Sequence, residues 1–233
     1  MKTLGIVGGI GPESTIEYYR FIIAEYRERT KDDTYPHIQI DSIDVSKGIA
    51  LVQSGDREAL ADYVGAGFQR LARAGAEIGL MAANTPHIAF DQIQRRSPIP
   101  LLSIVQATCD HAKKLGMKRL ALLGTGFTMK GSFYPDVFSR AGMELLIPNA
   151  EELAYIHEKY LGELLKNQFL PETKAHMLAI VDRLEKEEKV EGVILAGTEL
   201  PLILRDPERK GVPFLDTTLI HVSAAVDAIL KTG

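Results

Sequence analysis

Two short stretches of the sequence carry small polar side chains in an order that suits carboxylate binding. Asn84-Thr85-Pro86 follows one apolar run, and Gly197-Thr198-Glu199 follows another. Thr85 and Thr198 are predicted as N-caps, with Pro86 in the first helical turn. A helix start presents unpaired backbone N–H groups and a partial positive charge, which bind anions. If both stretches serve one ligand, a small molecule with two carboxylates is favoured. The simpler alternative is that both threonines only cap helices.

A glycine-rich turn, Gly8-Gly9-Ile10-Gly11-Pro12, follows the first apolar run. It partly matches a dinucleotide-binding fingerprint, but Ser14 stands where a third glycine would allow close helix packing. Asp41 and Asp44 lie further along the chain than the usual ribose-binding acid. No glycine-rich loop ends in Gly-Lys-Ser/Thr, which excludes a P-loop. We therefore expect Gly9, Ile10 and Gly11 to form a tight turn against a small ligand.

Metal binding and thiol chemistry both lack a clustered set of residues. The histidines are scattered without the paired spacing of a metal site. His87 follows soon after Thr85, which places it either at the edge of a site or on the surface. The single cysteine, Cys109, lies within a predicted helix, where a lone cysteine is usually a small packing residue. We expect no internal disulfide, no metal and no cofactor.

The elements that must position these residues alternate between short β-rich runs and amphipathic helical stretches. This order is typical of an α/β fold with a mostly parallel sheet covered by helices. In the first half the predicted strands are 3–7, 37–43, 78–82 and 100–102. The pattern then restarts. Three pairs of segments match in the same order: 1–9 with 117–125, 80–85 with 193–198, and 97–102 with 210–215.

The matches predict a duplicated α/β unit, with residues 1–116 as the first unit and 117–233 as the second. The final helix, 217–231, is a candidate to pack back onto the first unit. No long Gly/Ser/Pro linker separates the halves. We therefore expect two pseudo-symmetric parallel-sheet units that face each other across a central cleft. Ligands of parallel sheets bind beyond the carboxyl ends of the strands. The loops expected to line this cleft are 8–12, 83–86, 124–128 and 197–199.

Composition and charge exclude several functional classes. The 233 residues carry a net charge of −4, with the charges scattered, whereas a nucleic-acid surface needs a clustered basic patch. No run approaches the roughly 20 apolar residues of a membrane span. The first apolar run ends in glycines too early for a signal peptide. We expect a cytoplasmic protein with no nucleic-acid partner and no membrane contact.

Five segments, taken in order, carry a resemblance to a known family. They are 5–15, 84–87, 123–125 with Thr128 and Met129, 198–202, and 214–217. The chain resembles the aspartate/glutamate racemase superfamily, in the branch of aspartate racemases and broad amino-acid racemases. The resemblance implies a homodimer of two-domain α/β chains. It also implies an isomerase of amino-acid metabolism that uses neither pyridoxal phosphate nor a metal.

In that family two cysteines act on the substrate α-carbon, one removing its proton and the other returning a proton to the opposite face. By resemblance, Ala83 and Gly197 occupy the two cysteine positions here. Some family members replace the first cysteine, so Gly197 is the more serious departure. Neither a methyl group nor a hydrogen atom can carry the proton. Each positioned acid–base group contributes on the order of 10²–10⁴-fold, so efficient racemisation is not expected.

The resemblance implies that the ligand-binding residues remain. The expected set is Gly9, Ile10, Gly11, Asn84, Thr85, Thr125, Thr128, Thr198 and Glu199. Asp44 and Glu199 are the first candidates to replace the thiols, and Glu13, Tyr18 and Glu163 are further titratable candidates. The simpler alternative is that each of these carboxylates caps a helix or faces solvent.

Three interpretations of the whole chain follow. The first is a racemase-family enzyme that acts on a small acidic amino acid or dicarboxylate with altered or reduced chemistry. The second is a non-catalytic relative that binds an amino acid without turning it over. The third is a variant of an active racemase from which the cysteines were removed.

Overall fold

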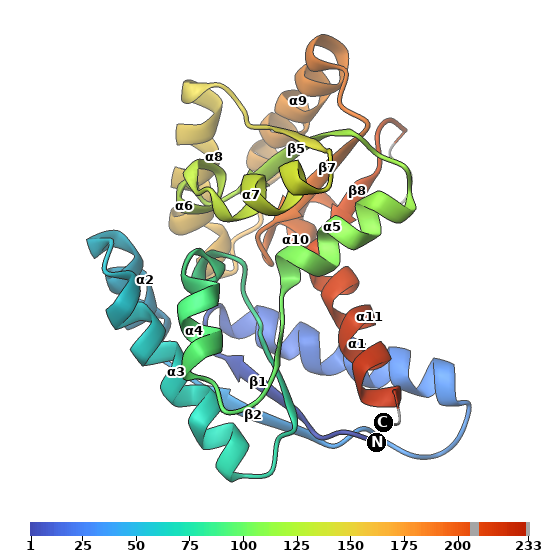
Figure 1. The fold of residues 1–233 in the computed structure, drawn as a ribbon. Coiled ribbons are helices and arrows are strands. Elements are labelled where there is room, and N and C mark those ends of the chain that lie inside the picture. Colours follow the sequence, from blue (N-terminus) through green and yellow to red (C-terminus); the bar gives the residue numbers. More distant parts are fainter. Residues whose placement is uncertain (206–209, 232–233) are drawn as a thin grey trace. The chain divides into compact units, whose positions relative to one another are not determined.

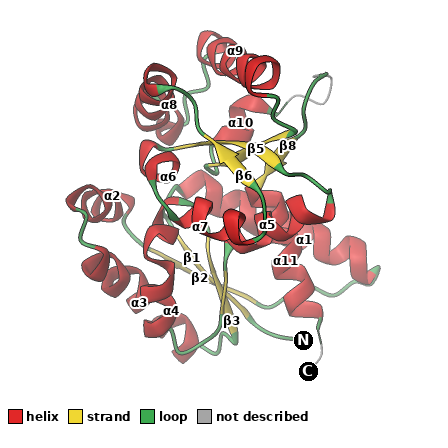
Figure 2. Ribbon diagram, turned by 45° about the horizontal axis from the view of Figure 1, so that its top comes forward, coloured by secondary structure: helices red, strands yellow, loops and turns green. Residues whose placement is uncertain are grey.

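The computed structural model describes residues 1–205 and 210–231 (Figure 1). Within these residues the strands form two four-stranded sheets, ordered β2-β1-β3-β4 and β6-β5-β7-β8. Every strand pair in both sheets is parallel. Helices flank both sheets (Figure 2). The repeated strand order confirms the predicted pair of pseudo-symmetric α/β units.

The contacts within the chain define two compact units. Unit 1 is Met1–Ala107 together with the residues from Thr218 onward, and unit 2 is Thr108–Thr217. The division falls within helix α5 (Ile104–Lys114). The sequence placed the boundary two residues beyond this helix, at residue 116.

Unit 1 contains the first sheet and the helices around it. Its elements are β1 (Leu4–Gly8), α1 (Pro12–Thr30), β2 (Ile38–Ser42), α2 (Val45–Ser54), α3 (Arg57–Arg73), β3 (Ile78–Met81), the 3-10 helix η1 (Thr85–Ala89), α4 (Phe90–Arg96), β4 (Leu101–Leu102) and α11 (Thr217–Leu230). Helix α2 was not among the elements predicted. The helical stretch that follows β3 is two pieces, η1 and α4, because the backbone at Ala89 leaves helical geometry with φ −120° and ψ 23°.

Alternating side chains of unit 1 build one core on each face of its sheet. Leu4 and Ile6 of β1 pack with α1 and α11 on one face. Val7 of β1 and Met81 of β3 pack with α3 and α4 on the other face. This is the consequence of successive strand residues pointing to opposite faces. Two-sided coverage explains why these strands are almost continuously apolar.

Helix α11 is an integral part of unit 1 although it lies at the far end of the sequence. It contributes four buried residues to the core that contains Leu4 and Ile6; they are Val222, Ala225, Val226 and Ile229. The backbone N–H of Lys2 donates to the carbonyl oxygen of Ile229 at 3.3 Å. Figure 1 shows α11 beside α1. Unit 1 is therefore built from both ends of the chain.

Unit 2 repeats the arrangement around the second sheet. Its elements are β5 (Arg119–Gly124), α6 (Gly126–Lys130), α7 (Phe133–Arg140), β6 (Glu144–Leu146), α8 (Ala150–Gly162), the 3-10 helix η2 (Leu164–Lys166), α9 (Pro171–Glu188), β7 (Gly192–Ala196), α10 (Leu200–Leu204) and β8 (Phe214–Asp216). Ala121 and Leu123 of β5, with Val193 and Leu195 of β7, form a core against helices α8, α9 and α10.

A reciprocal cap begins helix α8. The Asn149 side chain accepts from the Glu152 backbone N–H at 3.0 Å, and the Glu152 carboxylate accepts from the Asn149 N–H at 3.0 Å. Asn149→Ala is expected to lower the free energy of unfolding by about 0.5–2 kcal/mol, because it removes the side-chain oxygen that accepts from the Glu152 N–H. Urea unfolding measures this loss. Glu158→Ala, at an exposed position of the same helix, is the control; an equal loss in both variants would contradict the cap's role.

Candidate functional site

In unit 1 two of the predicted ligand-binding loops leave the sheet side by side. Val7 of β1 lies opposite Met81 of β3, and the Ala82 N–H donates to the Val7 carbonyl oxygen at 3.0 Å. The glycine turn follows β1, and Ala83-Asn84-Thr85 follows β3. Both loops therefore begin at the carboxyl edge of one sheet, which is where ligands of parallel sheets bind.

The glycine turn depends on the conformational freedom of its glycines. Gly9 has φ +78° and Gly11 has φ +101°, which side chains rarely adopt. A Cβ atom on Gly9 would lie 2.3 Å from the Ile43 carbonyl oxygen. The Gly9 N–H donates to the Thr15 hydroxyl at 2.9 Å, so this amide is used inside the loop. Ile10 is half-buried.

The two predicted threonine caps are wrong. Asn84 stands in the cap position before η1 with helical dihedral angles, φ −87° and ψ −52°, and makes no side-chain cap bond. Glu199 stands in the corresponding position before α10. The Thr198 hydroxyl instead donates to the Glu199 carboxylate at 3.0 Å. Both helices are short single turns of five residues, so their backbone dipoles alone give weaker support to anion binding than the sequence suggested.

Unit 2 has the corresponding pair of loops at its own sheet edge. Gly124, the last residue of β5, lies opposite Ala196, the last residue of β7. Thr125 and Gly197 follow them. The Thr125 hydroxyl oxygen accepts from the Thr128 N–H at 3.2 Å and caps α6, and the two hydroxyl oxygens lie 3.2 Å apart. The structure thus brings the predicted residues Thr125 and Thr128 together.

Beside Gly197 lies a buried tyrosine–glutamate pair. The Tyr160 hydroxyl of α8 donates to the Glu199 carboxylate, which also receives the Thr198 hydroxyl. Tyr160 is 4% exposed and Glu199 is 3% exposed. A Cβ atom on Gly197 would lie 2.5 Å from Tyr160 Cε2 and 2.7 Å from its hydroxyl oxygen. Tyr160 therefore occupies the space of the side chain that residue 197 lacks.

The protonation of this pair follows from its surroundings. Burial raises the pKa of Tyr160 well above its usual value, and the adjacent Glu199 carboxylate raises it further. The phenol is therefore protonated and holds a proton against a carboxylate oxygen. The sequence singled out Glu199 but missed Tyr160. The only signal for Tyr160 was the missing side chain at Gly197, which says that some neighbour must fill the space.

The other predicted substitutes for the thiols have different surroundings. The Asp44 carboxylate is exposed and caps α2 by accepting from the Ser46 N–H at 2.8 Å. Glu13 is exposed in the first turn of α1. Glu163 accepts from Lys159 Nζ and from the Thr173 hydroxyl. Of these predicted carboxylates, Glu199 is the one that is buried at a strand end.

A second buried polar cluster lies within unit 1. The Tyr18 hydroxyl donates to His221 Nδ1 at 2.9 Å, and His221 Nε2 donates to the Leu102 carbonyl oxygen at 3.1 Å. His87 Nε2 accepts from the Ile104 N–H at 3.2 Å. His87 is 2% exposed, so its alternative assignment to the surface is wrong. The core around η1 encloses it because the ring stacks on Phe90, with centroids 5.1 Å apart.

The remaining thiol is not at either sheet edge. Cys109 is buried in α5, where burial raises the pKa of its thiol. Its Sγ lies 3.9 Å from the Val137 carbonyl oxygen. This placement confirms the predicted packing role of Cys109.

Neither a metal site nor a membrane span is found in the described part of the chain. Between residues 1 and 205 and between 210 and 231, no group of three or more His, Cys, Asp or Glu side chains is arranged to hold a metal ion. The helices in those same ranges are all too short or too polar to cross a bilayer.

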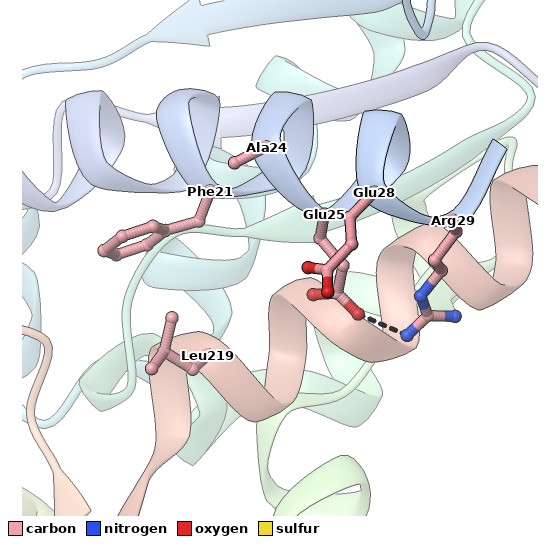
Figure 3. A pocket seen from close by; sticks show the side chains of 6 residues that line it. All are labelled: Phe21, Ala24, Glu25, Glu28, Arg29 and Leu219. Carbon is pink, nitrogen blue, oxygen red and sulfur yellow. Dashed lines mark hydrogen bonds and ion pairs between the residues drawn. The ribbon is translucent and has the colours of Figure 1, made fainter. Parts of the chain in front are cut away.

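A surface pocket of unit 1 contains none of the predicted site residues. It lies along the C-terminal half of α1 and the start of α11 (Figure 3), and its lining residues are Phe21, Ala24, Glu25, Glu28, Arg29 and Leu219. Arg29 is engaged there with Glu25 and with Asp227. The polar groups at the sheet edges therefore remain the better candidates for ligand binding.

The two parallel α/β units, each with polar loops at the carboxyl edge of its sheet, define a class of fold shared with several solved structures. A putative Asp/Glu racemase from Yersinia pestis has a TM-score of 0.89 at 31% identity, with 99% of this chain and 100% of that chain covered. An aspartate racemase homologue from Pyrococcus horikoshii has a TM-score of 0.85 at 32% identity, with the same coverage.

Sequence comparison then gives the family. The family model for Asp/Glu/Hydantoin racemases matches residues 7–225, and this chain belongs to that family. A broad specificity amino-acid racemase from Bacillus subtilis, RacX, is 24% identical over 231 residues, which cover 97% of this chain and 98% of the relative. The predicted family is thus confirmed.

Proposed function

We propose that this chain binds a small acidic amino acid or a dicarboxylate, without pyridoxal phosphate, through the loops at its two sheet edges. The proposal includes the loss of two-thiol racemisation, with Ala83 and Gly197 at the positions where family members carry cysteines. The protein is proposed to be a cytoplasmic homodimer. The relatives named as aspartate racemase homologue and amino-acid racemase support the ligand class.

The observation that carries this proposal is the pairing of loops at equivalent edges of two equivalent sheets. Asn84 and Thr85 follow β3, and Thr198 and Glu199 follow β7. The hydroxyl and amide groups suit a carboxylate or an ammonium group. Because Cys109 lies in a helix instead, neither loop retains a thiol. Polar binding groups without the thiols favour ligand binding over efficient racemisation.

Isothermal titration with L- and D-aspartate and L- and D-glutamate tests the proposal. Binding of at least one of them is expected. Asn84→Ala and Thr198→Val should each weaken that binding by about tenfold to a hundredfold, which corresponds to the loss of a hydrogen bond to a charged group. Thr34→Val, at an exposed position, should leave the affinity unchanged. Absence of binding for all four compounds would refute the assignment.

Size-exclusion chromatography with light scattering tests the homodimer. A mass of twice 25.7 kDa is expected at micromolar protein concentration.

A further inference from the structure

We propose that the hydroxyl of Tyr160, bonded to Glu199, is the proton-carrying group of the second sheet edge and takes the place of the missing side chain at Gly197. This inference rests on the proposed function and adds a residue to it. The phenol of Tyr160 in α8 lies in the space that any side chain at residue 197 would enter.

The Tyr160 hydroxyl lies where a side chain of residue 197 would begin. The Tyr160 hydroxyl oxygen lies 2.7 Å from where a Cβ atom of residue 197 would be, and its Cε2 lies 2.5 Å from that point. Any heavy-atom side chain at 197 and the present position of Tyr160 are mutually exclusive. The phenolic oxygen therefore lies close to where the thiol of a cysteine at residue 197 would be.

Tyr160 and Glu199 together can move a proton. Tyr160 donates to the Glu199 carboxylate, so the pair contains one movable proton and an anionic acceptor. Both residues are at least 96% buried, a setting that strengthens the hydrogen bond between them. Thr198 donates to the same carboxylate oxygen at 3.0 Å and helps to hold it in place. Such a pair can act as a base through the phenol, with the carboxylate receiving the phenolic proton.

The proton transfer balances within the pair and the substrate. The Cα–H bond breaks, its proton forms a bond to Tyr160 Oη, and the phenolic proton passes to Glu199 Oε2. The electron pair of the broken bond stays on the substrate as the enolate of its α-carboxylate. Return of a proton along the same route restores the amino acid. In D₂O the carboxylic proton exchanges with solvent, so the returned atom is deuterium.

With Tyr160 as the one proton-carrying group, we expect α-proton exchange without inversion of Cα. Ala83 has only a methyl group, so it supplies no second proton at the first sheet edge. Removal and return by the same group leave the configuration of Cα unchanged. The protein should therefore exchange the α-proton of one enantiomer at least tenfold faster than it inverts that centre.

The experiment follows α-proton loss by ¹H NMR in D₂O, and inversion by chiral chromatography, for both enantiomers of aspartate and glutamate. Tyr160→Phe is expected to slow exchange by about 10²–10⁴-fold while the affinity for the amino acid changes only a few-fold. Tyr155→Phe is the matched control, because Tyr155 lies on the same helix but stacks on His176. It should exchange at the wild-type rate.

Glu199→Gln distinguishes a role of Glu199 in proton transfer from a purely structural role. It keeps a hydrogen-bonding group but cannot accept the phenolic proton as a carboxylate does. In Glu199→Gln the exchange of the α-proton should therefore be slowed, because the phenolic proton has no carboxylate to pass to.

The outcomes are distinguishable from those of the proposed function. If no amino acid binds, the proposed function fails and this inference fails with it. If an amino acid binds but the wild type exchanges no α-proton, or if Tyr160→Phe exchanges as fast as the wild type, this inference alone is overturned.

Discussion

Gly197→Cys on its own is expected to destabilise the protein by about 1–3 kcal/mol and to restore no racemisation. The reason is overpacking: the new Cβ atom would meet two ring carbons and the hydroxyl oxygen of Tyr160 at 2.5–2.9 Å. To relieve this contact Tyr160 must move, and its bond to Glu199 is then broken. The buried carboxylate loses a donor, which adds to the cost.

Combining Gly197→Cys with Tyr160→Leu should recover part of that stability. Leucine lacks the two ring carbons and the hydroxyl oxygen that clash, but it keeps an apolar side chain in the core of unit 2. Urea unfolding of the wild type, both single variants and the double variant gives a coupling energy, expected at about 0.5–3 kcal/mol in favour of the double variant. Addition of Ala83→Cys to the double variant then tests for inversion of the amino acid.

Gly162→Cys is the matched control for this cycle. It lies at the end of α8, and nothing is within 4 Å of its added Cβ position. Its stability should stay within about 0.5 kcal/mol of the wild type. A Gly197→Cys protein as stable as the wild type would show that Tyr160 does not fill that space in solution.

The second large effect is acid destabilisation of unit 1 by His87 and His221. Burial lowers the pKa of His87 to about 3, with a smaller effect from His221, and burial lowers the pKa of His221 to about 4. Each ring nitrogen that would take up a proton already accepts a bond, from the Ile104 N–H or from the Tyr18 hydroxyl. The ring centroids are 6.5 Å apart, so two charged rings would also repel.

The direction of the pH effect follows from these lowered values. The unfolded chain binds protons at its histidines as the pH falls below about 6.5, while the folded chain does not until about pH 4. The stabilisation is therefore complete above pH 6.5 and is lost on acidification. Each histidine is expected to remove about 1.4 kcal/mol per pH unit across that window.

Urea unfolding at pH 7.5 and pH 4.5 measures this dependence. His221→Gln should make the fall in stability between the two pH values smaller by about 2–3 kcal/mol, whatever its effect at pH 7.5. His37→Gln, at an exposed histidine, should leave the pH dependence as it is in the wild type. Equal pH dependence in all three proteins would rule out His221 as a source of the effect.

The sheets were predictable because their signal is local and repeated. Two-sided burial makes β1 and β5 apolar runs that end in glycine, and this pattern occurs in both halves. Helix α2 was missed because it is short and begins directly after the second strand. The cap assignments failed because the sequence around Thr85 or Thr198 looks alike whether a helix begins at the threonine or at the residue before or after it.

The candidate site was predictable only where its residues follow the strands directly. Thr125, Gly197 and Glu199 lie within a few residues of β5 or β7, so the fold places them without further information. Tyr160 belongs to α8, and its position beside Gly197 depends on how that helix packs on the sheet. The same holds for His221 and Tyr18, which come from opposite ends of the sequence.

Helix α11 also sets an order of events during synthesis of the protein. Because Val222, Val226 and Ile229 complete the core that begins with Leu4 and Ile6, a nascent chain on the ribosome must wait for its last helix before unit 1 can close. Unit 2, by contrast, is continuous in sequence and is fully synthesised earlier. The half of the molecule made first is thus the half that finishes folding last.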